Sequence, residues 1–187
     1  MIEEVGVLLF VTADDKQRRI KTERLYHLYR AGMYKAAYGI LHEKHLAEDA
    51  VHESFIRILK NLHKINEIDC PQTRSFVVII CRNVAKNMLR ERLYLNNSED
   101  LCEELSDGGA QNPEGIVLSR ETLAEMEKAI EELPEIYRDT LLMKRAHGMS
   151  NEEIAEAFGI TAEAVKKRLT RARQMVMEKL RREDYNE

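Results

Sequence analysis

A dense set of basic side chains lies near the C-terminal end of this 187-residue chain. The segment from Lys166 to Arg182 holds eight Lys and Arg residues and one acid, Glu178. Ammonium and guanidinium groups bind phosphates and the acceptor-rich edge of guanine in the major groove of DNA. We therefore predict a face that reads double-stranded DNA. Its predicted members are Lys166, Lys167, Thr170, Arg171 and Arg173.

Basic helix faces also occur on proteins that bind no nucleic acid, where the charges are simply solvated. The residues before this face favour DNA binding. Ser150 and Glu153 form a capping box that opens a short helix. Gly159 then allows a tight turn, and Thr161 can cap a second helix. Together with the small Ala155 at the expected helix crossing, these signals predict a helix-turn-helix.

The rest of the chain is also predicted to be helical. Charged residues make up 33% of it and apolar residues 44%, with 8 Gly and 3 Pro. Such a composition favours helix over sheet. Apolar residues recur at three- and four-residue spacing. The predicted helices are 15–41, 47–62, 74–93, 121–133, 136–146, 151–158 and 162–181, with a loop at 64–73.

The charges divide the chain into parts. Residues 22–95 carry 12 basic and 8 acidic residues, whereas residues 96–128 carry 2 and 9. A protein of net charge −4 can still bind DNA when its basic residues are gathered on one element. The predicted fold is all-α, with two small helical domains joined by an acidic linker. The predicted parts are an N-terminal extension (1–21), a first domain (22–95), the linker (96–119) and a second domain (120–187).

Several classes of site are not indicated. Cys70, Cys81 and Cys102 are odd in number and widely spaced, so neither a disulfide framework nor a zinc site is expected. Gly-rich phosphate loops and nucleophile motifs are missing, so we expect no enzyme and no cofactor. The apolar run 5–11 follows two acids and is too short to span a membrane. A cytoplasmic protein without membrane insertion is the resulting expectation.

Two groups of segments resemble the sigma-70 family of bacterial RNA polymerase factors. ELPEIYRD (132–139), GMSNEEIA (148–155) and VKKRLTRAR (165–173) resemble its C-terminal promoter-binding domain, sigma region 4. AEDAVHESFIR (47–57) resembles its polymerase-docking helix, and FVVIICRNVAKNMLR (76–90) resembles its helix for the minus-10 element, both in sigma region 2. Larger sigma factors have a middle domain that this chain lacks. The resemblance is therefore to the extracytoplasmic-function (ECF) group.

The resemblance implies three sets of contacts. Basic residues of the C-terminal helix would read the minus-35 element, and the loop 64–73 would hold a flipped minus-10 base. Core polymerase would be bound by Asp49, Glu53 and Arg57. Contacts to the minus-10 strand would come from Arg82, Asn83, Lys86, Asn87 and Arg90.

The assignment of Asp49 has a structural alternative, and the role of Phe76 is open. Asp49 falls in the first turn of its predicted helix, where the helix dipole alone favours an acid. Phe76 stands where many relatives carry Trp, and it fits either a DNA contact or the apolar core.

The resemblance implies a factor that binds core RNA polymerase, recognises minus-35 and minus-10 elements, and promotes melting of the DNA. Melting of this kind needs no hydrolysis, because binding of the single strand offsets the cost of unpairing. The resemblance also implies a possible further partner, an anti-sigma protein. The alternative is a helix-turn-helix regulator with an N-terminal sensing domain, which would require a ligand pocket in the first half.

Overall fold

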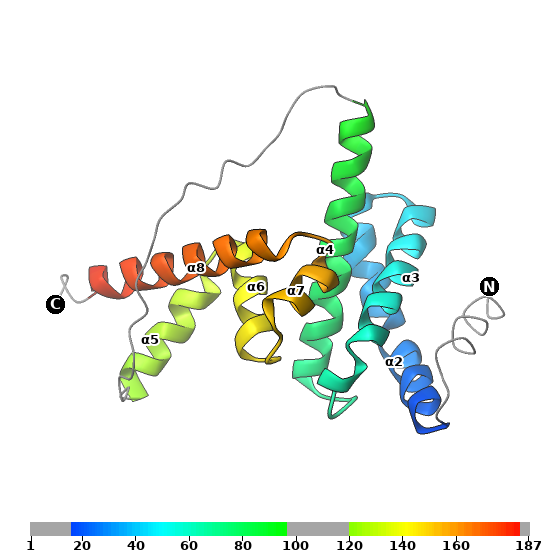
Figure 1. Cartoon of the computed structure of the whole chain (residues 1–187), viewed down its shortest axis with the longest axis horizontal. Helices are drawn as coiled ribbons and strands as arrows, with labels where there is room; N and C mark the ends of the chain where they lie inside the picture. Colours follow the sequence, from blue (N-terminus) through cyan, green and yellow to red (C-terminus); the bar gives the residue numbers. More distant parts are fainter. Residues whose placement is uncertain (1–15, 97–119, 184–187) are drawn as a thin grey trace. The chain divides into compact units, whose positions relative to one another are not determined.

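The structure is a computed structural model that describes residues 16–96 and 120–183 (Figure 1). Within those ranges it contains seven α helices and one short 3-10 helix, which confirms the predicted all-α fold. The chain divides into two units. The apolar run 5–11, Cys102 and nearly all of the predicted linker lie outside the described residues.

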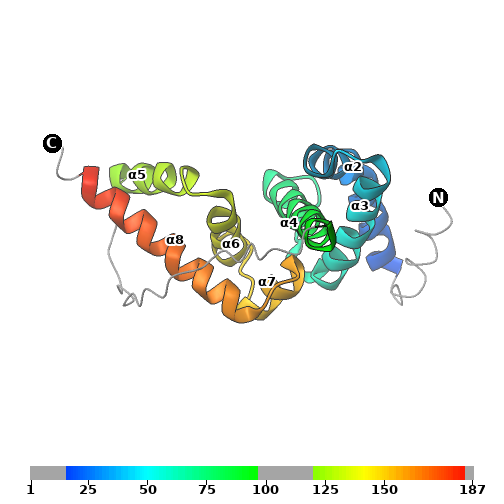
Figure 2. The ribbon, with the colours of Figure 1, turned by 90° about the horizontal axis from the view of Figure 1, so that it is seen from above.

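The first unit is a bundle of three long helices: α2 (Lys16–Leu41), α3 (Lys44–Lys60) and α4 (Pro71–Asn96). Each of them packs against the other two, as Figure 2 shows end-on for α4. A 3-10 turn, η1 (Leu62–Lys64), follows α3. The core between the helices is apolar and closed to solvent. It includes Leu25, Met33, Ile58, Phe76, Val77 and Ile80, all at most 1% exposed.

The starts of α3 and α4 each lie three residues earlier than the sequence predicted. α3 begins at Lys44, not at residue 47, and it has no acid in its first turn. Asp49 therefore lies beyond the first turn, and the explanation of this acid by the helix dipole is wrong. α4 begins at Pro71, inside the predicted loop 64–73. Proline fits this first helical position because its missing N–H would have no partner there.

The second unit holds α5 (Arg120–Glu131), α6 (Glu135–Arg145), α7 (Asn151–Phe158) and α8 (Ala162–Glu183). α8 packs against both α5 and α6. Leu133 precedes Pro134, and the helix boundary predicted at this pair is confirmed. Buried apolar side chains of the unit include Leu133, Met143, Met149, Ile154, Val165 and Leu169.

The local signals of the helix-turn-helix are all present. The backbone N–H of Glu153 donates to Ser150 Oγ at 3.1 Å, and the Ser150 N–H donates to Glu153 Oε2 at 2.7 Å. Thr161 Oγ1 accepts from the Ala164 N–H at 3.1 Å. Gly159 takes a positive φ of 67° between the two helices, a conformation that favours glycine. The capping box, the cap and the turn are thus confirmed.

Replacing Ser150 with alanine should destabilise the second unit by about 1 kcal/mol, because it removes the side-chain acceptor of the capping box. Hydrogen exchange of the α7 amides in the full chain measures this loss. Thr161→Ala is a matched variant, since it removes an equivalent cap at the start of α8. Unchanged protection of α7 in Ser150→Ala would contradict the prediction.

Candidate nucleic-acid interface

The predicted minus-35 face lies on α8, opposite the buried side of the helix. Val165, Leu169, Ala172 and Val176 follow a three- and four-residue spacing and are all buried. Apart from Arg168, which is buried, the side chains between these positions are exposed or half-buried. Of the predicted set, Lys166, Arg171 and Arg173 are exposed, and Lys167 and Thr170 are half-buried.

The basic run of α8 is not uniform, and two of its members are used inside the unit. Arg168 is buried with its neighbours in the core. Lys179 pairs with Glu132 beyond the end of α5, and this hydrogen bond lowers the pKa of the Glu132 carboxyl. The run therefore divides into residues that face solvent and residues that hold the unit together. All five predicted minus-35 residues belong to the first group.

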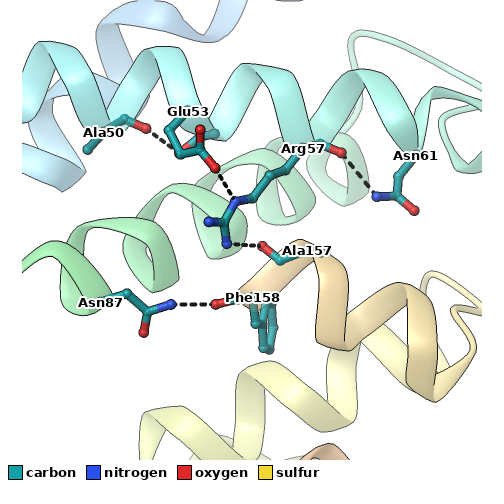
Figure 3. Close-up of polar contacts among 8 residues, drawn as sticks. Ala50, Glu53, Arg57, Asn61, Asn87, Ala157 and Phe158 are labelled. Atoms are coloured by element: carbon teal, nitrogen blue, oxygen red, sulfur yellow. Dashed lines mark hydrogen bonds and ion pairs between the residues drawn. The ribbon is translucent and has the colours of Figure 1, made fainter. Parts of the chain in front are cut away.

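The predicted polymerase-binding residues form one stripe on α3. Asp49, Glu53 and Arg57 follow each other at four-residue steps, so they share a helix face. The Arg57 Nε donates to Glu53 Oε1 at 2.8 Å (Figure 3). Asp49 is exposed and Glu53 is half-buried. The stripe therefore offers two carboxylates, one of them already oriented by an arginine.

The backbone of α3 next to this stripe is also tied by side chains. Asn61 Nδ2 donates to the Arg57 carbonyl at 3.0 Å, and Ser54 Oγ donates to the Ala50 carbonyl at 2.5 Å (Figure 3). Asn61 and Ser54 are both buried. Burying polar groups costs little free energy when they are hydrogen-bonded in this way. The two bonds also fix the C-terminal half of the helix that carries the stripe.

The predicted minus-10 residues of α4 are not all on its surface. Arg90 is exposed, and the Arg82, Lys86 and Asn87 side chains are half-buried. Asn83 is only 8% exposed, and its Nδ2 donates to the Ile79 carbonyl at 2.9 Å. Its amide is turned back onto its own helix, a common use of asparagine within helices. The prediction that Asn83 presents its side chain to DNA is therefore corrected: the side chain is buried and bonded to its own helix.

Phe76, whose role the sequence left open, is a core residue. Its side chain is 1% exposed and lies among the buried residues of the first unit. A ring in this position has no surface on which a base could stack. The alternative of a DNA contact at Phe76 is therefore excluded by its burial.

Side chains that sequence analysis missed hold the segment between η1 and α4. Lys21, which was assigned to the N-terminal extension, donates to the carbonyl of Leu62 in η1 and to the carbonyl of Ile65 just after it. Tyr29, whose ring is buried in the core of the first unit, donates its hydroxyl to the Ile68 carbonyl at 2.6 Å. Burial raises the pKa of Tyr29, and nearby Asp69 and Cys70 add to the shift. Its hydroxyl remains protonated and able to donate at neutral pH.

Residues 16–96 and 120–183 contain no group of three or more His, Cys, Asp and Glu side chains placed to hold a metal ion. Cys81 is buried and donates its thiol to the Met33 carbonyl at 3.4 Å. Burial raises the pKa of this thiol to about 11, so it stays protonated. No helix in the described ranges is long and apolar enough to cross a membrane.

Each of the two units matches a known protein family. Residues 25–93 match the family described as Sigma-70 region 2, and residues 123–176 match Sigma-70, region 4. The chain is 31% identical over 140 residues to the ECF RNA polymerase sigma-E factor of Salmonella typhimurium, covering 71% of this chain and 72% of that one. It is 26% identical over 181 residues to the ECF RNA polymerase sigma factor SigE of Mycolicibacterium smegmatis, covering 95% and 68%.

Among solved structures, the sigma factor RpoE of Bartonella quintana, in complex with the anti-sigma factor NepR, matches with a TM-score of 0.33. The identity is 22%, and the match covers 83% of this chain and 94% of that one.

Proposed function

The chain belongs to the ECF group of the sigma-70 family, and we propose that it binds core RNA polymerase, directs it to promoters and promotes their melting. The observation that carries this proposal is the pairing of a region 2 bundle with a region 4 helix-turn-helix in one chain. The alternative of a regulator with an N-terminal sensor is not favoured, because region 2 occupies the place of the sensor.

Reading of the minus-35 element is assigned to the solvent-facing side of α8. Lys166, Lys167, Thr170, Arg171 and Arg173 are accessible there. Arginine and lysine donate to guanine O6 and N7 in the major groove, and threonine can bond to either base of a pair. The first helix of such a motif crosses the DNA backbone while the second enters the groove. We therefore assign base contacts to α8.

Capture of the minus-10 strand is assigned to α4 and to the segment before it. Arg82, Lys86, Asn87 and Arg90 supply donors and positive charge along one helix. Single strands bind to such surfaces through phosphates and through the faces and edges of unpaired bases. The free energy of that binding offsets the cost of opening the duplex, so no nucleotide hydrolysis is required.

Docking to core polymerase is assigned to the α3 stripe of Asp49, Glu53 and Arg57. Its acids are explained neither by a helix terminus nor by burial. We assign them to a basic or hydrogen-bonding partner surface, which by family resemblance is the clamp helices of the largest polymerase subunit. Opposite charges on two partner surfaces guide their association and fix its register.

Changing Glu53 to lysine should weaken binding to core polymerase by about 1–3 kcal/mol, because it sets like charge against the partner surface. The new lysine also stands one turn from Arg57 and loses the existing ion pair. Titration of labelled polymerase with the variant measures the change. Glu23→Lys makes the same charge change on the exposed side of α2 and should leave affinity intact. Equal affinity for Glu53→Lys and the wild type would reject the docking assignment.

The remaining parts of the proposal follow from the family. Sigma factors are transcription initiation factors, and we infer that this chain acts without catalysis or cofactor, in the cytoplasm. An anti-sigma protein is proposed as a further partner on resemblance alone.

The direct test is run-off transcription with purified core polymerase on promoter fragments from the genome that encodes the chain. We expect discrete transcripts that depend on the added protein. The same fragments with a scrambled minus-35 element serve as the control and should lose them. Tight binding to the fragments without any effect on transcription would favour the regulator instead.

A further inference from the structure

Residues 62–70, which comprise η1 and the segment that leads from it to α4, are held by side chains of α2. Lys21 Nζ donates to the Leu62 carbonyl at 3.3 Å and also to the Ile65 carbonyl. The lysine therefore bonds to both ends of η1, at its first residue and at the residue that follows its last. Ile65 itself is 3% exposed, so its side chain anchors the same point in the core.

A second anchor, also on α2, holds the middle of the segment. The Tyr29 hydroxyl donates to the Ile68 carbonyl at 2.6 Å and lies 3.5 Å from the Cys70 carbonyl. The ring of Tyr29 is 5% exposed and is therefore itself fixed by packing. A hydroxyl on a packed ring has few positions available, so it holds its acceptors in a defined place.

The third anchor comes from the first turn of α4. Thr73 Oγ1 donates to the Glu67 carbonyl at 2.5 Å, and the Thr73 N–H donates to Cys70 Sγ at 3.4 Å. Thr73 is 5% exposed. Together with Lys21 and Tyr29, it directs the backbone carbonyls of this segment toward the bundle.

The outer side of the segment carries side chains instead. Asn66, Glu67 and Asp69 are exposed. A surface loop normally loses conformational freedom when it binds a ligand, and that loss weakens binding. A loop whose carbonyls are already bonded to packed side chains has lost most of that freedom in advance. Discrimination between similar ligands also needs donors and acceptors in fixed places.

We propose that Lys21 and Tyr29 are positioning residues for minus-10 recognition, which hold residues 62–70 in the shape that selects one unpaired promoter base. The proposal rests on the proposed function and gives these two α2 residues a role that requires no contact with a base. Both residues act through the backbone of the segment, so their loss should alter the choice of base more than the strength of docking.

Two variants remove the anchors with little change of shape. Tyr29→Phe keeps the ring and deletes the hydroxyl, and Lys21→Met keeps an unbranched apolar side chain and deletes the ammonium. Matched controls lie on the same helix. Tyr38→Phe removes a hydroxyl from a ring that is 45% exposed, and Lys35→Met removes an exposed charge.

The experiment uses holoenzyme assembled from the full chain and core polymerase. The probe is a library of promoter templates opened in advance, with the unpaired non-template strand of the minus-10 region randomised. Templates that yield transcript are sequenced, which gives the base preference at each position. We expect the wild type to prefer one base by roughly tenfold at one or more positions. In Tyr29→Phe and Lys21→Met the preference should fall to about two- to threefold at one position or two adjacent ones, with other positions and core affinity unchanged.

Each other outcome has a definite meaning. An unchanged preference profile in both variants overturns the proposal and leaves the proposed function standing. The proposal is also overturned if the variants lose base preference equally at all positions, or if they bind core polymerase more weakly. Either result would assign Lys21 and Tyr29 a merely structural role. A wild type without preference at any unpaired position rejects minus-10 recognition itself, and with it that part of the proposed function. Changes in the Tyr38→Phe or Lys35→Met control as large as those in the variants would show that the anchors are not specific.

Discussion

Replacing Lys167 and Arg171 together with alanine is expected to weaken binding to a minus-35 duplex by about 2–6 kcal/mol. The two residues stand four apart on the solvent-facing side of α8, so they can reach the same groove. Each base contact made by such a side chain contributes about 1–3 kcal/mol, and the double variant loses both. Titration of holoenzyme onto a labelled promoter duplex measures the change.

The control separates base reading from general loss of charge. Lys128→Ala combined with Arg145→Ala removes two exposed charges from α5 and α6 of the same unit. It should weaken binding less and show the same sequence preference as the wild type. Scrambling the minus-35 element should lower the affinity of the wild type much more than it lowers the affinity of the α8 double variant. If it costs both the same factor, Lys167 and Arg171 do not read that element.

Replacing Phe76 with alanine is expected to destabilise the first unit by about 3–5 kcal/mol, the usual cost of removing a buried aromatic ring. Phe76 is 1% exposed and lies in the apolar core of the first unit. A small domain has a total stability of only about 5–15 kcal/mol, so this loss is a large share of it. Hydrogen exchange of α4 amides in the full chain reports on the first unit alone.

Leu93→Ala is the matched control, because this residue of α4 is 47% exposed. It should cost about 0.5 kcal/mol or less, as substitutions outside a core usually do. The result also bears on the question that the sequence left open at Phe76. A Phe76→Ala variant with full α4 protection but weakened minus-10 binding would contradict its assignment to the core.

Features encoded locally were predicted well from the sequence. The capping box, the Thr161 cap and the Gly159 turn each depend on residues within a few positions of one another. The physical reasons for them act at short range, so neighbouring residues suffice to predict them. The helix start at Pro71 is local too, but the sequence prediction placed Pro71 inside the loop 64–73, although proline also suits a first helical position.

Features set by packing were predicted less well. Asn83 reads as polar surface in the sequence, yet it is buried because α4 packs against two helices and its amide can bond to Ile79. Tyr29 fits an apolar stripe by its ring, and nothing near it in sequence reveals the acceptor of its hydroxyl. That acceptor is Ile68, 39 residues along the chain. Contacts of this kind become visible only when the helices are assembled.

The anchors on α2 and α4 bond to main-chain carbonyls, and every amino acid supplies a main-chain carbonyl. The amino acids at Asn66, Glu67 and Asp69 can therefore be exchanged without deleting any acceptor that Lys21, Tyr29 or Thr73 uses. During evolution such a loop can diversify rapidly while its scaffold is inherited unchanged. On the role proposed for residues 62–70, a gene duplicate of this protein would need only a few codon changes in this segment to select a different promoter base.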